Sequence, residues 1–454
     1  MSGLLFSNMV WIPKATLSPS QMTKLRDKYT LQGREGFAGE PPPIAKLYVD
    51  TSTYFGVPRN HGLTNLPLPK NSTIFKGAHP KWPDLKFPNG GTWRPGQREA
   101  VDACVQFFKD GNFGGRLEGK CGFGKTIAGL AVAQKFNARV CVLTHKNDLV
   151  ENWQQDAAKF FPGLTLGHVQ GDEWAFEGAH VTTCLVQTLW ARKGRYPKGF
   201  TKAFDMIIMD EGHRFASHIF EYVLKVFGAR YRLAVSATWR RKDGLEDIWN
   251  YHIGPLIHAA KSDALTGKYV FVYPSIRIQQ LYTRTPWGRI LTKVAENAQY
   301  LTWLSEELVK AAKKGRKILC VADRVDMLIQ LKRLTQRALI RDGYDKTTGL
   351  FVGSINNKQI PKKRLEETKK CDIILGTYGM ISEGTDIPAL DTLFIGTPRS
   401  DVEQVVGRIQ RKQLGKKSLL VVDPILQGHA TFSRTGRKRE GHYTKLGFTR
   451  ARAK

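Results

Sequence analysis

Gly119-Lys120-Cys121-Gly122-Phe123-Gly124-Lys125-Thr126 is the stretch of sequence that decides the fold of this chain. Its pattern, G-x-x-x-x-G-K-T, is that of a P-loop, whose glycines allow a tight turn with backbone N–H groups pointing at phosphate oxygens. We expect Lys125 to reach the terminal phosphates of a nucleotide and the Thr126 hydroxyl to bind Mg²⁺. Residues 127–136 predict a helix whose N-terminus would strengthen anion binding. By itself the pattern also fits a glycine-rich turn that binds no nucleotide.

Short apolar runs alternate with helical stretches on both sides of this loop. Such runs, bounded by turn residues, are typical of buried strands in a parallel sheet that is covered on both faces. The first series of predicted strands is 139–143, 181–186, 206–209 and 233–236, and the second is 317–321, 373–375, 393–395 and 419–422. The sequence therefore predicts an α/β protein with two successive sheet domains.

Changes in composition suggest where these domains begin and end. Residues 1–84 are rich in Pro and Gly and predict a small accessory domain, either duplex-DNA-binding or a scaffold packed on the first sheet domain. The first sheet domain is predicted at 85–259 and the second at 260–430. The last residues, 431–454, contain many Arg and Lys and predict a flexible basic tail.

The charge and the cysteines limit the partners. The 454-residue chain has 70 Lys and Arg against 40 Asp and Glu, a net charge of +30, which favours a polyanionic partner over a basic protein with no specific partner. Its six cysteines lack metal-ligand spacing, so neither zinc nor a disulfide framework is expected, and a reducing cytoplasm fits. The sequence has no convincing signal peptide and no stretch as long as a membrane span, so no membrane partner is expected.

Two acidic residues directly follow one of the predicted strands. Asp210 and Glu211 come after the apolar run 206–209, at the end of a strand where parallel α/β sheets bind ligands. Asp210 is expected to hold Mg²⁺, partly through water, and Glu211 to orient or deprotonate an attacking water. An Asp-Glu pair alone is usually a solvated turn, but its position after a P-loop favours the catalytic interpretation.

Two further segments suit a nucleotide site. Arg94 and Gln97 precede the P-loop, and the glutamine amide can present a donor and an acceptor to the edge of adenine. Far along the chain, Gln404, Arg408 and Arg411 lie in a predicted helix, where the arginines would share one face. Arginines from a second domain can stabilise the charge that develops in phosphoryl transfer. A solvated or nucleic-acid-facing helix is the alternative.

Together, in this order and spacing, these motifs over residues 90–425 resemble the superfamily 2 helicases and translocases. The resemblance implies two tandem RecA-like domains, ATP and Mg²⁺ as cofactors, and catalytic roles for Lys125, Asp210, Glu211, Gln404, Arg408 and Arg411. It adds Ser236 to Thr238 as a coupling motif and Gly384 and Asp386 as nucleotide-site residues. The motif Asp-Glu-Gly-His, ending at His213, points away from the DEAD-box RNA helicases.

A narrower likeness is to branch-migrating phage helicases of the UvsW type, and within them to the T5-type phage helicase. It rests on residues 236–244, 382–388 and 47–56. It implies action on forked and branched DNA in replication, recombination or repair, in the cytoplasm, which is that of a bacterial host if a phage encodes the chain.

The same resemblance suggests which residues touch nucleic acid. Polar groups at strand ends can bind phosphates without reading bases, although they can also simply end strands. The candidates are Thr144, His145, Lys146, Gln187, Thr188 and Thr377. Three tryptophans near basic residues, Trp174, Trp190 and Trp239, could stack on bases, with buried packing as the alternative.

The sequence thus predicts an ATP-dependent DNA helicase or translocase that acts on single-stranded, forked or branched DNA, with RNA as the less favoured partner and a monomer as the expected state. The alternatives are a DNA translocase that remodels protein–DNA complexes without separating strands, and a non-catalytic basic DNA-binding or annealing protein.

Overall fold

The computed structural model describes the chain except for residues 1–4, 35–41, 67–79, 121, 213–221, 240–243, 261–264, 383–386, 412 and 453–454. Four of the residues singled out from the sequence therefore lie outside the described residues: Cys121, His213, Gly384 and Asp386. The chain divides into two compact units, unit 1 (Met1–Ser262) and unit 2 (Asp263–Lys454).

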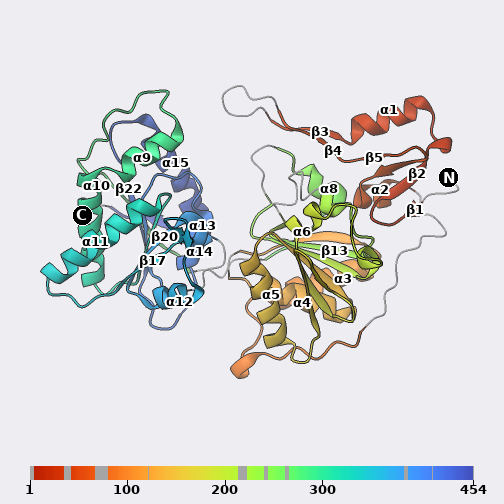
Figure 1. Ribbon diagram of the computed structural model, residues 1–454, viewed down its shortest axis with the longest axis horizontal. Helices are drawn as coiled ribbons and strands as arrows, with labels where there is room; N and C mark the ends of the chain where they lie inside the picture. Colours follow the sequence, from red (N-terminus) through yellow and green to blue (C-terminus); the bar gives the residue numbers. More distant parts are fainter. Residues whose placement is uncertain are drawn as a thin grey trace. The chain divides into compact units, whose positions relative to one another are not determined.

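Unit 1 is built on an eight-stranded sheet that is parallel except for one edge strand (Figure 1). In spatial order its strands are β10 (Glu173–Ala175), β9 (Leu166–Gln170), β11 (Val181–Leu185), β8 (Val140–Thr144), β12 (Met206–Asp210), β13 (Tyr231–Ser236), β7 (Gly114–Glu118) and β14 (Leu256–Ala259). Alternate side chains of a strand face opposite sides of the sheet. Val140 and Val142 accordingly pack in one buried cluster, and Cys141 and Leu143 in another.

Helices cover both faces of this sheet. On one face lie α3 (Gln97–Lys109), α4 (Lys125–Lys135) and α5 (Asn147–Phe160), whose buried residues share the cluster of Val140. On the other face, α6 (Val186–Ala191) and α8 (Asp247–His252) share the cluster of Cys141 (Figure 1). Burial of these apolar faces fixes the strand ends that carry the polar candidates.

The N-terminal segment packs on this second face. It contains the antiparallel sheet β1 (Leu5–Phe6), β2 (Val10–Pro13), β6 (Tyr54–Val57) and β5 (Val49–Asp50), the hairpin β3 (Thr30–Gln32) and β4 (Ile44–Lys46), and the helices α1 (Pro19–Lys28) and α2 (Arg59–Asn65). The buried Arg59 donates to the carbonyls of Ala229 and Arg230, and Arg232 Nη2 donates to Asn8 O at 2.8 Å. These contacts fit a packed scaffold, and duplex binding by this segment stays a prediction.

Unit 2 contains a seven-stranded sheet, all parallel. In spatial order its strands are β17 (Thr348–Phe351), β20 (Ile373–Thr377), β16 (Ile318–Ala322), β21 (Thr392–Ile395), β22 (Leu419–Pro424), β15 (Gly267–Val272) and β23 (Thr449–Arg450). A short separate hairpin, β18 (Ser354–Ile355) and β19 (Lys358–Gln359), follows β17 in the sequence. One face is covered by α9 (Trp287–Ala295), α10 (Ala298–Lys313) and α11 (Val325–Arg341), and the other by α13 (Tyr378–Ser382) and α14 (Glu403–Ile409). The predicted α/β class with two RecA-like parallel-sheet domains is confirmed.

The end of the chain differs from the flexible basic tail that its composition suggested. Residues 430–445 form α15 (Ala430–Lys445), and β23 pairs with β15. Arg439 forms a fully buried ion pair with Asp423, with Nε–Oδ2 at 2.7 Å, and Tyr443 donates to the same carboxylate. Composition misled because the basic residues of α15 hide a face of buried side chains that includes Phe432 and Tyr443.

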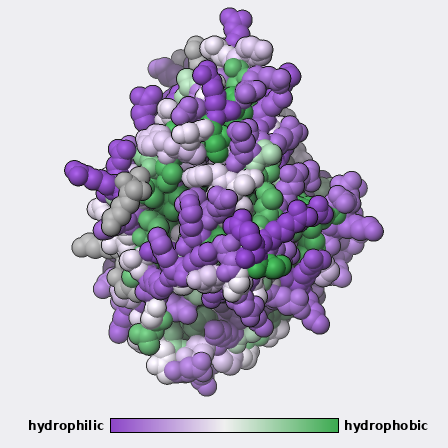
Figure 2. Space-filling view, turned by 90° about the vertical axis from the view of Figure 1, so that its left-hand side faces the viewer, coloured by the Kyte–Doolittle hydropathy of each residue, from purple (hydrophilic) through white to green (hydrophobic). Residues whose placement is uncertain are grey.

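The face drawn in Figure 2 is mostly hydrophilic. In the face drawn in Figure 2, hydrophobic side chains form scattered patches between hydrophilic ones. Among the helices of the described residues, none is long and apolar enough to cross a membrane.

Candidate nucleotide-binding site

The P-loop lies between β7 and α4, as its sequence predicts. Gly124 precedes α4 with φ of 84°, a backbone conformation that favours glycine. A Cβ atom there would also lie 2.2 Å from Gln97 Nε2, so a side chain at this position would collide with Gln97. Lys125 is the first residue of the helix, and its ammonium donates to Gly119 O at 3.1 Å. The lysine is thus held over the loop in which its phosphate partners would bind.

Gln97, the first residue of α3, and Arg94, just before that helix, both bind the same loop. Gln97 is buried, its Oε1 accepts from the Arg94 N–H at 2.7 Å, and its Nε2 donates to Phe123 O at 2.6 Å. The Arg94 guanidinium donates to Gly122 O. The amide that the sequence assigned to adenine is therefore engaged by the loop itself, and it would have to exchange these partners to bind a base.

Asp210 ends β12 as a buried carboxylate. Its Oδ1 accepts from the Glu211 N–H at 2.9 Å, and its Oδ2 accepts from the Trp153 indole at 2.8 Å. Burial, and next the charge of Glu211, raise the pKa of Asp210 to about 6, while Lys125 and the Trp153 hydrogen bond oppose this rise. Lys125 of the P-loop and Asp210 are therefore close enough to interact, which joins two motifs about 85 residues apart.

Helix α5 supplies two residues that the motif search missed. Trp153 and Asp156 are three positions apart and so share one helix face. Trp153 donates to Asp210, and the Asp156 carboxylate lies close enough to Thr126, the residue expected to bind Mg²⁺, for its hydroxyl to act on the pKa of Asp156. Burial raises the pKa of Asp156, and the nearby cations and the Thr126 hydroxyl oppose the rise. Their i, i+3 spacing was the only sequence signal, and it is common in helices.

Replacing Trp153 with phenylalanine should slow ATP hydrolysis. The phenylalanine ring would still fill the core, but the Asp210 carboxylate would lose the hydrogen bond from the indole. A hydrogen bond to a charged group is worth about 1.5–3 kcal/mol, so we expect kcat to fall about tenfold or more. Steady-state ATPase kinetics measure this. Trp249→Phe, another fully buried tryptophan of unit 1, is the control, and an unchanged kcat in Trp153→Phe would remove the role of this bond.

The segment after β13 also reaches the P-loop. Ser236 accepts at its carbonyl from the Gly119 N–H at 2.9 Å, and its hydroxyl donates to Thr238 O at 2.7 Å. Trp239 is buried against Trp249 with ring centroids 5.2 Å apart, so it serves packing. Trp174 likewise packs on Phe200, whereas Trp190 stays 40% exposed.

The nucleic-acid candidates differ in accessibility. Thr144, His145 and Thr188 are buried, and Thr188 accepts from the Gly171 N–H at 3.1 Å. Gln187 is exposed, although its Nε2 donates to His145 O at 2.9 Å, and Lys146 and Thr377 are half-buried. Gln187, Lys146 and Thr377 therefore offer side chains at the carboxyl ends of their strands.

The arginine motif of unit 2 departs from the expected helix face. Helix α14 ends at Ile409, so Arg411 lies beyond it and does not share a helical face with Arg408. Gln404 is half-buried within the helix. Arg408 is buried, and its Nε donates to Ile381 O at 2.9 Å, which ties this motif to α13.

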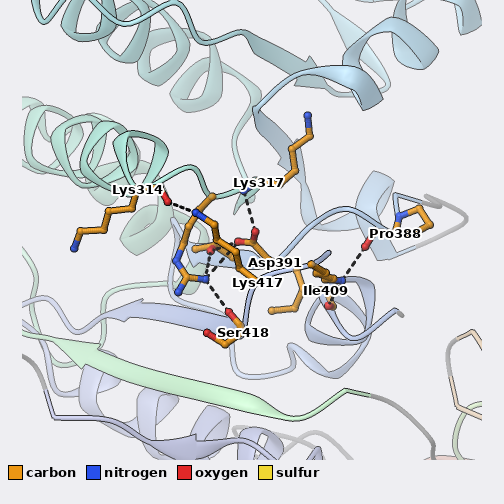
Figure 3. Close-up of polar contacts among 10 residues, drawn as sticks. Lys314, Lys317, Pro388, Asp391, Ile409, Lys417 and Ser418 are labelled. Carbon is orange, nitrogen blue, oxygen red and sulfur yellow. Dashed lines mark hydrogen bonds and ion pairs between the residues drawn. The ribbon is translucent and has the colours of Figure 1, made fainter. Parts of the chain in front are cut away.

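Lys416 fixes the end of the arginine motif. Its ammonium donates to the carbonyls of Ile409 and Arg411 at 2.7 Å and of Pro388 at 2.8 Å. Carbonyls that end a helix need such donors, which explains why the helix stops before Arg411. Figure 3 shows Pro388 and Ile409 beside this contact. Next to it Lys317 N–H donates to Asp391, the Lys417 ammonium to Lys314 O, and the Arg316 guanidinium to Ser418 O. Burial lowers the pKa of Lys416 to about 8.

Glu403 of α14 lies beside two basic residues of α15, His442 and Lys445. Lys445 Nζ lies 2.9 Å from Glu403 Oε1, and His442 Nδ1 lies 3.6 Å from Oε2. Chiefly the contact with His442, with help from Lys445, lowers the pKa of Glu403 to about 2. A carboxyl group whose pKa falls on folding stabilises the native state above its unfolded pKa, and this stability is lost as the pH falls towards the folded pKa.

Glu403→Gln should therefore destabilise unit 2 at neutral pH. After allowance for solvent screening we expect a loss of about 1 kcal/mol, which shrinks as the pH falls below about 4.5. Urea unfolding at pH 7 and pH 3 measures this difference. Glu366→Gln, in an exposed pair with Lys369, should change little at either pH, and a pH-independent effect at Glu403 would contradict the ion-pair explanation.

Known proteins were compared with this chain. Residues 91–241 match the family model described as the res subunit of type III restriction enzymes. A protein of Acanthamoeba polyphaga mimivirus, whose name assigns it to the ATP-dependent RNA helicases, is 27% identical over 443 residues, which cover 95% of this chain and 80% of that protein. A helicase of Escherichia phage T5 is 26% identical over 341 residues, which cover 74% of this chain and 70% of that protein. Among solved structures, that of the ATP-dependent type ISP restriction-modification enzyme LlaBIII bound to DNA is similar to this chain, with a TM-score of 0.58 and 14% sequence identity. The alignment covers 80% of this chain and 31% of the LlaBIII chain.

Two RecA-like sheets, one carrying a P-loop next to a buried Asp-Glu pair, define a nucleotide-hydrolysing motor class. The protein is an ATP-hydrolysing helicase, and it resembles the phage and viral helicases of superfamily 2. The resemblance inferred from the sequence motifs is thereby confirmed.

Proposed function

We propose that this helicase is a DNA motor that unwinds or branch-migrates forked and junction DNA in replication, recombination or repair. The observation that carries the motor assignment is one sheet domain that holds both the P-loop, with Lys125 bonded to Gly119 O at the start of α4, and the buried Asp210 at the end of β12. A nucleic-acid track is supported by the net charge of +30, and DNA by the Asp-Glu-Gly-His motif, which points away from the DEAD-box RNA helicases.

In this proposal the nucleotide site is formed by Arg94, Gln97, the P-loop residues 119–126, Gly384 and Asp386. Lys125 binds the terminal phosphates, Glu211 orients the attacking water, and Gln404, Arg408 and Arg411 of unit 2 stabilise the charge of the transition state. Arg408 and Arg411 would act on ATP that is bound to unit 1, so hydrolysis would change how the two units hold the strand.

Magnesium would suit the oxygen donors of Thr126 and Asp210. Burial and the charge of Glu211 raise the pKa of Asp210, and a divalent cation would offset that crowding of negative charge. When bound, Mg²⁺ would neutralise phosphate charge. Asp156 and Trp153 would orient Thr126 and Asp210 for this purpose.

The strand would contact polar groups at the carboxyl ends of both sheets. Lys146 and Gln187 of unit 1 and Thr377 of unit 2 offer accessible cationic, amide and hydroxyl groups, with Thr144, His145 and Thr188 shaping the loops behind them. Such groups bind phosphates without reading sequence, as a motor requires.

Strand displacement measured beside triplex displacement tests the proposal. On forked and four-way DNA we expect ATP-dependent strand separation that is faster than on blunt duplex DNA. Displacement of a third strand without separation of any duplex would instead favour a translocase that remodels protein–DNA complexes. Binding and annealing with no ATP hydrolysis would favour the non-catalytic alternative.

RNA is the second candidate track, and the name of the mimivirus relative favours it. Single-stranded DNA and RNA of the same sequence should be compared as activators of ATP hydrolysis at one salt concentration. Stronger stimulation by RNA would replace DNA in the proposal.

A further inference from the structure

Unit 2 contains a segment with unusual composition directly after β15. From residue 265 to residue 295 the sequence has no Asp or Glu, and its basic residues are Lys268, Arg277, Arg284, Arg289 and Lys293. The same segment exposes three aromatic rings: Tyr282 is 74% exposed, Tyr273 60% and Trp287 40%. Large exposed rings within a basic segment are typical of nucleic-acid binding. We call residues 273–293 the aromatic–basic strip.

The backbone of the strip is held in place on the sheet domain. Ile276 and Ile278 are buried, and Ile278 N–H donates to Gln427 O at 2.9 Å. A tight turn follows, in which Thr285 Oγ1 accepts from the Tyr282 N–H at 2.7 Å and Tyr282 O accepts from the Thr285 N–H at 2.9 Å. His429 Nε2 lies 3.0 Å from the same Tyr282 carbonyl. The rings are therefore presented by a fixed turn.

The strip lies at the edge of the sheet where the other strand contacts are proposed. It begins at the carboxyl end of β15 and is tied to Gln427 and His429, which follow β22. Arg324, which follows β16, donates from Nη2 to Gly288 O at 3.2 Å. Because these strands are parallel, their carboxyl ends share one edge with that of β20, where Thr377 lies.

The basic groups of the strip are available to a partner. Within the described parts of the chain, Arg284 and Arg289 form no ion pair, and both are exposed. Lys293 instead donates to Gln280 Oε1 at 2.8 Å. Guanidinium groups beside exposed rings suit a strand whose bases are unpaired, because bases can stack on rings while phosphates bind the cations.

We propose that the aromatic–basic strip is a binding site for single-stranded nucleic acid, in which Tyr282 and Trp287 stack on bases and Arg277, Arg284 and Arg289 bind phosphates. This rests on the proposed function, to which it adds contacts with bases. The site tolerates any sequence because every base has a face on which a ring can stack.

The test uses the full chain without nucleotide, with a fluorescein-labelled oligothymidine strand and fluorescence anisotropy. Tyr282→Ala and Trp287→Ala should each weaken binding about tenfold. Arg284→Ala should weaken it less and lower the slope of log affinity against log salt by about 0.7. The matched controls are Tyr344→Ala, a 42% exposed tyrosine elsewhere in unit 2, and Arg337→Ala, an exposed arginine of α11.

Basal ATP hydrolysis without nucleic acid should be unchanged in every strip variant, which also reports on folding. If the wild-type protein binds the strand and the strip variants bind it as tightly, or weaken only as much as the controls, the strip is not a binding site, while the proposed function stands. If the wild-type protein binds no strand and its ATPase is not stimulated, the proposed function fails as well.

Discussion

Lys125→Ala is expected to abolish nucleic-acid-stimulated ATP hydrolysis, with kcat reduced by about a thousandfold or more. Lys125 begins α4, its ammonium lies over the P-loop at 3.1 Å from Gly119 O, and it interacts with Asp210. Alanine would keep the helix but remove the lysine charge that a P-loop uses to bind the terminal phosphates. A coupled assay for ADP release measures the loss.

Lys135→Ala is the matched control, because Lys135 is an exposed residue at the other end of the same helix. It should hydrolyse ATP like the wild-type protein. Robust turnover by Lys125→Ala, with thermal stability equal to that of the control, would show that the P-loop is not the hydrolytic site.

Arg411→Ala should separate ATP binding from hydrolysis. An arginine supplied from a second domain typically accelerates phosphoryl transfer by 10³–10⁵, so we expect turnover to fall by about a thousandfold while nucleotide affinity changes little. Arg411 is preferred to Arg408 for this test, because Arg408 is buried against Ile381 O and its removal would also disturb packing. Fluorescent ATP-analogue binding beside steady-state hydrolysis gives both quantities.

Arg437→Ala, an exposed arginine of α15, serves as the control for the loss of one positive charge. Equal losses of nucleotide affinity and turnover in Arg411→Ala would mean that the arginine binds ground-state ATP. Unchanged turnover would exclude Arg411 from the hydrolytic step.

Much of the fold follows from local patterns. Runs such as 206–209 are apolar throughout because a strand of a covered parallel sheet is buried on both faces, and β12 indeed spans Met206–Asp210. The P-loop and the acidic pair were found because their chemistry needs residues that are adjacent in sequence. The predicted strand ends differ from the observed ends by at most two residues, as when β13 begins at Tyr231 rather than 233.

The remainder of the site depends on contacts between distant residues. Nothing local indicates that Trp153 donates to a carboxylate 57 positions away, or that the Gln97 amide binds the P-loop. The Lys416 ammonium binds the carbonyls where α14 ends, before Arg411. The buried ion pair of Arg439 with Asp423 holds α15 against the sheet. These pairings form only once the sheets are packed, so a local pattern cannot predict them. Composition alone therefore predicted a flexible tail for residues 431–454.

The central claim is that ATP hydrolysis by this protein is driven by a nucleic-acid track. Its most direct test is the rate of ATP hydrolysis by the full chain as single-stranded DNA is added, at low and then at higher salt. The account predicts a saturable rise in rate whose half-point moves to higher DNA concentration as salt increases, because phosphate contacts displace counterions. A rate that stays flat at every concentration of DNA and of the matching RNA would contradict it.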